Sequence, residues 1–179
     1  MNKYLKWMLP LFVIALLLAA CGSREVQEPN NSDTPAAPGN SQGEPEPVKE
    51  EMKIKVYLTD DQLLELTEVE ASIAFADEQE KLEAALAALQ QDGSEDYFSL
   101  WSEIKILSVN VQDGALTVDL EIPDEANLGS SGELLALEAI EKTVFQFEEI
   151  KSLDLLVQGE AVDSLMGHME LEHPIERPL

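Results

Sequence analysis

The sequence has little cysteine and little histidine, the residues on which many catalytic and metal sites depend. Its 179 residues include one cysteine, Cys21, and two histidines, His168 and His173. A lone thiol excludes a disulfide within the chain and a zinc site built from cysteines. A nucleophile needs a neighbouring base, and neither a G-x-S-x-G motif nor a distinct pair of carboxylates appears. We therefore expect a protein that is not an enzyme and that holds no cofactor.

Basic residues are scarce as well. The chain has 11 Lys and Arg against 36 Asp and Glu, a formal net charge of −25. Such a surface repels nucleic acid and anionic lipid head groups, so we expect no nucleic-acid partner. It either stays solvated or attracts a basic partner or loosely held cations. No D-x-[DN]-x-[DN]-G calcium loop is present.

The first 20 residues have the pattern of a targeting segment. A basic head, 1–6, precedes an apolar run, 7–20, which is shorter than the roughly 20 apolar residues of a stable membrane-spanning helix. The run ends in Leu18-Ala19-Ala20-Cys21, and a glycine follows. This ending resembles the lipobox of bacterial lipoprotein signal peptides.

The lipobox resemblance implies that the thiol of Cys21 receives a diacylglycerol and that cleavage leaves Cys21 as the new N-terminus. Two acyl chains bury enough CH₂ groups for stable anchoring. Residues 1–20 are then a signal peptide, and the protein is held by its lipid on the extracytoplasmic face of the cell membrane. Two alternatives are a plain cleaved signal peptide with a chance cysteine and an uncleaved anchor.

Residues 21–51 differ in composition from the rest of the chain. They are rich in Pro, Gly, Asn, Ser and Glu and nearly free of large apolar residues. Such a segment cannot bury enough surface to offset the entropy of ordering it, which predicts a disordered acidic tether after the lipidated cysteine. Its root-mean-square reach is about 30 Å. Residues 52–179 remain as one folded domain, long enough for a single hydrophobic core.

Within this domain, hydrophobic periodicity alternates between strand and helix patterns in the order β-β-α-β-β-α-β. The order predicts an α+β fold, a single small domain with both helices packed on one face of one sheet. The predicted strands are 52–58, 64–73, 104–112, 115–122 and 151–158, and the predicted helices are 78–91 and 130–148.

Two short motifs mark the starts of the predicted helices. Asp77 with Glu80 has the spacing of a capping box, and so has Ser130 with Glu133. In such a box each side chain bonds a free backbone N–H of the first turn. We therefore expect both glutamates to face their own helix ends.

A hairpin is predicted between the third and fourth strands. Asp113-Gly114 lies between two runs of alternating apolar residues, which is typical of a two-residue β-turn. The alternation changes phase between Ile106 and Val109, which indicates a β-bulge.

Three aromatic residues gather in one predicted connection. Tyr97, Phe98 and Trp101 lie between the first helix and the hairpin. Such a cluster serves either as a platform for a ligand or as a lid packed onto the core, and the second interpretation is favoured.

His168, Glu170 and Glu172 form the sharpest metal candidate. On a strand these three side chains would share a face and offer N and O ligands to zinc or another divalent ion. The glutamates fit equally well on the solvent side of a strand whose Met169 and Leu171 face the core. His168 would then belong to a structural Gly-His turn, and no metal would bind, which is the interpretation we favour.

Several stretches together resemble the GerMN domain of bacterial sporulation and germination proteins. The resemblance covers most of residues 52–179, and it rests on an ordered set of motifs rather than on one of them. Two loops depart from the family pattern, at Asp92-Gly93 and Trp101-Ser102-Glu103. The matching positions are Ala84–Leu89, Val118-Asp119-Leu120, Gly129–Gly132, Thr143, Gly159, Gly167-His168 and Pro174.

The GerMN resemblance implies an extracytoplasmic, often lipid-anchored domain whose fold is similar to the ring-building modules of secretion machines. It implies a non-catalytic assembly role through an envelope protein partner in sporulation or spore germination. The alternative is an envelope lipoprotein that associates with a sensor kinase or binds a small ligand. The oligomeric state stays open at this point.

Overall fold

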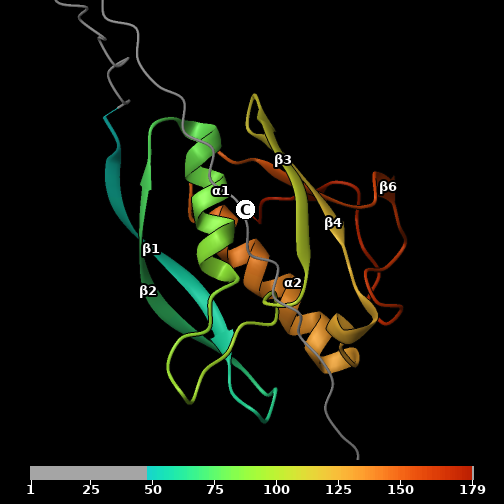
Figure 1. Ribbon diagram of the computed structural model, residues 1–179. Coiled ribbons are helices and arrows are strands. Elements are labelled where there is room, and N and C mark those ends of the chain that lie inside the picture. The colour runs from blue at the N-terminus through green and yellow to red at the C-terminus, as the bar shows by residue number, and fades with distance from the viewer. Residues whose placement is uncertain (1–47, 179) are drawn as a thin grey trace, which may run out of the picture. The chain divides into compact units, whose positions relative to one another are not determined.

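The computed structural model describes residues 48–178 (Figure 1). The predicted signal peptide, Cys21 and most of the predicted tether lie outside these residues. None of the helices described is both long and apolar enough to cross a membrane.

The described chain begins with a two-stranded ribbon. Strands β1 (Glu50–Thr59) and β2 (Leu66–Phe75) pair antiparallel over their whole length. Alternation in β1 turns Ile54, Val56 and Leu58 to one face, where each is at most 3% exposed. Burial of this apolar row fixes the register of the ribbon, because a one-residue slip would expose it.

Helix α1 (Glu78–Leu89) follows the ribbon, and the predicted capping box forms in part at its start, because Glu80 bonds the N–H of Ala76 rather than that of the N-cap residue Asp77. The Asp77 carboxylate accepts a 2.8 Å hydrogen bond from Glu80 N, and the Glu80 carboxylate accepts one of 3.0 Å from Ala76 N. The helix buries its stripe of Leu82, Leu86 and Leu89.

The remaining strands form a second, mixed sheet in the order β3-β4-β5-β6, and β7 also pairs with β5. Strands β3 and β4 are an antiparallel hairpin, whereas β4 and β5 are parallel and joined by a crossover through the second helix. The strands are β3 (Lys105–Gln112), β4 (Ala115–Glu121), β5 (Ser152–Val157), β6 (Glu160–Ala161) and β7 (Ile175–Glu176).

The β3–β4 hairpin confirms both local predictions. Its turn is Asp113-Gly114, with φ of 54° and 86°, and the register shifts between Ile106 and Ser108, where the bulge was expected. A side chain on Gly114 would place its Cβ 2.5 Å from the carbonyl oxygen of Glu149. Glycine is therefore required by the left-handed backbone and by this close approach.

The short 3-10 helix η1 (Asp124–Ala126) leads into helix α2 (Ser130–Phe145). The capping box predicted at its start is wrong. The N-cap residue is Gly129, no side chain caps it, and the Glu133 carboxylate turns away to bond a distant segment. The helix also ends earlier than predicted, and Arg177 donates to the carbonyl of its last residue, Phe145, and to that of Phe147 beyond it.

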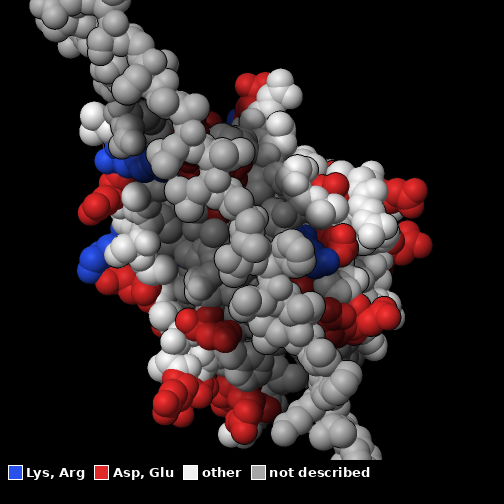
Figure 2. Space-filling view, viewed as in Figure 1, with Lys and Arg blue, Asp and Glu red and all other residues white. Residues whose placement is uncertain are grey.

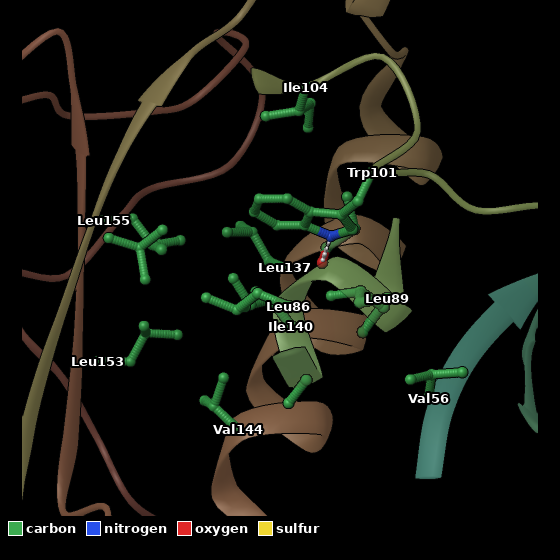
Figure 3. Packing of buried hydrophobic residues seen from close by; sticks show 14 of the residues in the cluster. Val56, Leu86, Leu89, Trp101, Ile104, Leu137, Ile140, Val144, Leu153 and Leu155 are labelled. Atoms are coloured by element: carbon green, nitrogen blue, oxygen red, sulfur yellow. Dashed lines mark hydrogen bonds between the residues drawn. The ribbon is translucent and has the colours of Figure 1, made fainter. Parts of the chain in front are cut away.

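The α+β class is confirmed, but the prediction of one sheet is wrong. The helices α1 and α2 lie between the β1–β2 ribbon and the larger sheet, so the layers run ribbon, helices, sheet (Figure 1). The close view of the core agrees, with Val56 of the ribbon on one side of the helices and Leu153 and Leu155 of β5 on the other (Figure 3). Both apolar faces of the helix pair are thereby buried.

The aromatic connection packs as a lid over this core. Trp101 is fully buried, and its indole Nε1 donates a 2.9 Å hydrogen bond to the carbonyl oxygen of Ala136 in α2 (Figure 3). Phe98 pairs with Thr59 through two backbone hydrogen bonds. The interpretation as a lid is confirmed for Trp101, whose polar atom has the partner that burial requires.

Candidate functional site

The predicted lipid attachment residue, Cys21, lies outside the described residues. Its role therefore stays a prediction from the sequence. The described residues offer two further regions to consider: the C-terminal segment with both histidines, and the outer surface of α1.

His168 is one of several residues that contact a buried carboxylate. The Glu133 side chain has no exposed surface. Its Oε1 accepts hydrogen bonds from Ser164 Oγ at 2.7 Å and Met166 N at 2.9 Å, and its Oε2 accepts one from His168 N at 2.9 Å and lies 3.0 Å from His168 Nδ1. The carboxylate thus holds the loop 164–168 against the first turns of α2.

The electrostatics of Glu133 follow from these contacts. Burial by itself raises the pKa of the Glu133 carboxyl, but the hydrogen bonds from Met166, Ser164 and His168 to the charged form outweigh it. The pKa of Glu133 therefore lies below its usual value, and the group is a carboxylate at neutral pH.

The structure does not bring the metal candidates together. Residues 168–172 are bend and irregular chain rather than the strand that would align His168, Glu170 and Glu172. Among residues 48–178, no group of three or more His, Cys, Asp or Glu side chains has an arrangement suited to a metal ion. What sequence reasoning missed is Glu133, because its partners lie more than 30 residues away along the chain and leave no local pattern.

His173 ties the same segment to β5. Its Nδ1 lies 2.7 Å from Asp154 Oδ1, and its Nε2 lies 2.7 Å from the carbonyl oxygen of Val162. Both ring nitrogens face acceptors, so only the protonated ring can donate to both. The Val162 carbonyl and then the Asp154 carboxylate raise the pKa of His173 above its ordinary value.

The outer surface of α1 lies between two strands. On one side a groove of about 440 Å³ separates the helix from β2, lined by small residues that include Ala74, Ala84 and Ala87. On the other side a groove of about 260 Å³ separates it from β3 and includes Leu107, the bulge residue, whose exposed fraction is 49%. The small side chains of Ala84, Ala87 and Ala88 leave the groove beside β2 open to solvent.

The strand edges around the helices differ in how they are closed. Gln79 closes the outer edge of β3, donating to the carbonyl of Val109 at 2.6 Å and accepting from Val111 N at 3.3 Å. Gln146 closes the outer edge of β1 in the same way through the N–H and C=O of Lys55, at 2.9 and 2.8 Å. Within the described part of the chain, the outer edge of β2 has no such partner.

The charged surface of the described domain is acidic, as Figure 2 shows for one face. Each described cation already has a partner. Six lysines pair with carboxylates, Lys151 donates to the carbonyl of Asp113, and Arg177 donates to backbone carbonyls. The six ion pairs are Lys49–Glu80, Lys53–Glu70, Lys55–Glu68, Lys81–Glu149, Lys105–Glu121 and Lys142–Glu138.

The fold defines the chain as a small α+β domain with two sheets. Residues 55–163 match the family described as Germane, sporulation and spore germination, and since the match spans more than half of the chain, the protein belongs to that family. The resemblance to GerMN domains is thereby confirmed. None of the curated protein sequences compared with the chain matches it.

Solved structures show the same fold. The first GerMN domain of the sporulation protein GerM from Bacillus subtilis matches with a TM-score of 0.53 and 14% identity, over 70% of this chain and 98% of that one. A "Putative Lipoprotein from Clostridium perfringens" matches with a TM-score of 0.50 and 22% identity, over 72% of this chain and 88% of that one. At these identities the likeness concerns the fold alone.

Proposed function

We propose that this protein is a lipid-anchored lipoprotein of the extracytoplasmic membrane face, whose Germane domain binds protein partners without catalysis during sporulation or spore germination. The family match over residues 55–163 carries the proposal. The lipobox-like segment ending at Cys21 supports the anchor, and so does the similarity in fold to the Clostridium perfringens protein, which is described as a lipoprotein.

The side-chain chemistry of the domain supports a binding role rather than a reaction. Both ring nitrogens of His173 and the Nδ1 of His168 face acceptors inside the C-terminal segment. The groove between α1 and β2 is open to solvent and lined mainly by small residues, and this suits contact with a protein surface better than enclosure of a small substrate.

In-cell cross-linking of the tagged, full-length protein tests this function. We expect the cross-linked material, identified by mass spectrometry, to contain sporulation or germination proteins. The Cys21→Ser variant is the control for the anchor and should lose lipid labelling and most of these cross-links. Recovery of a sensor kinase instead would favour the alternative role in the vegetative envelope, and unchanged lipid labelling of Cys21→Ser would contradict the anchor.

A further inference from the structure

The outer edge of β2 presents backbone groups that the domain does not use. Gln146 bonds both the N–H and the C=O of Lys55, so these groups point away from β2. In an antiparallel pair, two residues directly opposite each other either both point their N–H and C=O groups toward the other strand or both point them away from it. Lys55 lies opposite Glu70, and the same alternation assigns Glu68 and Ser72 to the outward set. Their N–H and C=O groups therefore face outward from the ribbon.

This edge is long and regular. Strand β2 has ten residues, no proline or glycine, and an unbroken register with β1. Exposed edges of this kind are templates for pairing with another strand, and proteins usually interrupt or cover them. The side-chain amides of Gln146 and Gln79 close the outer edges of β1 and β3, whereas the outer edge of β2 pairs with no other strand of the described residues.

The groove beside the edge has room for the side chains of an added strand. It lies between β2 and α1, with Ile73 and Ala74 on the strand and Ala84, Ala87 and Ala88 on the helix. A strand laid along β2 would turn every second side chain toward these alanines. Apolar residues of small to medium size fit that position.

The opposite face of the ribbon sets the chemistry of the other side chains. There Glu68 and Glu70 have exposed fractions of 50% and 64%, and each already pairs with a lysine of β1. A second cation beside each glutamate, from an added strand, meets a carboxylate with free acceptor positions. The acidic domain as a whole favours the approach of such a segment.

We propose that the outer edge of β2 binds an extended segment of a protein partner as an added strand, with apolar residues facing α1 and Lys or Arg residues beside Glu68 and Glu70. The proposal rests on the protein-binding function proposed above and names the surface and the kind of segment that it takes.

The chemistry of the edge favours a separate partner over this chain itself. The segment 24–47 contains five prolines and almost no large apolar residues, so it cannot supply alternating donors and apolar side chains. A second copy of β2 would bring a strand with two further glutamates and no lysine.

The first experiment titrates two peptides of equal charge into the full chain in nonionic detergent micelles, with calorimetry as the readout. One is Lys-Val-Lys-Val-Thr-Val-Lys-Val, and the other has proline at each valine position. We expect the valine peptide to bind at least tenfold more tightly and to slow amide hydrogen exchange along β2, because only it can pair as a strand. Equal affinities, or no binding of the valine peptide, would overturn the proposal.

A matched pair of variants tests the edge itself. Ser72→Pro removes one outward N–H and leaves the pairing with β1 intact, and we expect it to weaken binding of the valine peptide at least tenfold. Ser72→Ala keeps the N–H and should bind as the unchanged protein does. Undiminished binding to Ser72→Pro would contradict the proposal, because it would show attraction by charge alone.

A second variant guards against an effect of proline on folding. Ala87→Gln narrows the groove without touching the backbone of β2, and we expect it to weaken valine-peptide binding as well, with an unchanged far-ultraviolet circular dichroism spectrum.

The experiments distinguish a failure of the proposed β2 site from a failure of the proposed assembly function. In-cell cross-links to partners without any peptide binding would overturn the β2 site alone, whereas peptide binding at β2 without such cross-links would remove the assembly role and support the edge.

Discussion

The two sides of the helix pair differ in whether side chains cover the backbone groups that the sheets leave unpaired. On the side of α2, side chains close the structure: Gln146 bonds the edge of β1, Glu133 holds the loop 164–168, and Arg177 covers the carbonyls at the end of the helix. On the side of α1, Gln79 closes the edge of β3, but the edge of β2 and the alanine-lined groove stay open. The difference indicates that the surface available for binding lies near α1.

The largest expected effect on stability comes from the buried carboxylate of Glu133, on the side of α2. Glu133→Gln replaces one acceptor oxygen with a donor that faces N–H or O–H groups, so we expect a loss of about 3 kcal/mol in the free energy of unfolding. Urea denaturation measures it. Glu138→Gln, on the exposed face of the same helix, is the control and should change stability by less than about 0.5 kcal/mol. Similar losses in both variants would show that burial of Glu133 has no special role.

The closed edge of β1 is expected to contribute less. Gln146→Ala removes the two hydrogen bonds to the backbone of Lys55, and we expect a loss of about 1–2 kcal/mol. The amide of Lys55 should also exchange with solvent faster, as measured by nuclear magnetic resonance. Gln112→Ala, at the exposed end of β3, serves as the control. An unchanged exchange rate at Lys55 would mean that the edge is protected by something other than this amide.

The contact of His173 should make the closed side sensitive to pH. Because the folded state raises the pKa of His173, its contribution is complete below the unfolded value of about 6.5 and is lost as the pH rises through the folded value. We expect His173→Ala to cost about 1 kcal/mol at pH 5.5 and less at pH 8.5. Thermal unfolding at both pH values checks the sign, and a cost that grows with pH would contradict it.

The open side should give the smallest effect on stability. We expect Ser72→Pro to change the free energy of unfolding by less than about 1 kcal/mol, since its N–H makes no bond within the ribbon. Ala71→Pro, one residue earlier, removes an N–H that bonds β1 and should cost about 3 kcal/mol. Equal costs at the two positions, measured by urea denaturation, would show that the edge of β2 is already paired.

Local sequence patterns account for most of the elements and for few of the contacts between them. The capping box of α1 and the Asp113-Gly114 turn were predictable because each depends on residues within four positions. The same spacing misled at α2, where Glu133 bonds groups more than 30 residues away instead of its own helix end. Local sequence does not determine whether a carboxylate bonds its own helix end or a segment that is distant along the chain.

The division of the strands into two sheets was equally invisible in the sequence. The alternation in β1 and β2 indicates one buried face but not the element that covers it. In the structure that element is the helix pair, and Gln146 takes the position beside β1 that another strand would have occupied. The candidate surface on β2 is a consequence of this arrangement and has no motif of its own.

The buried indole of Trp101 gives the protein a built-in optical reporter. The chain has two tryptophans, Trp7 and Trp101, and removal of the predicted signal peptide would leave only the second. All tryptophan emission of the processed protein would then arise from one fluorophore, hydrogen-bonded to Ala136 at the centre of the molecule. A red shift of that emission during unfolding would report when the lid separates from α2, without any attached dye.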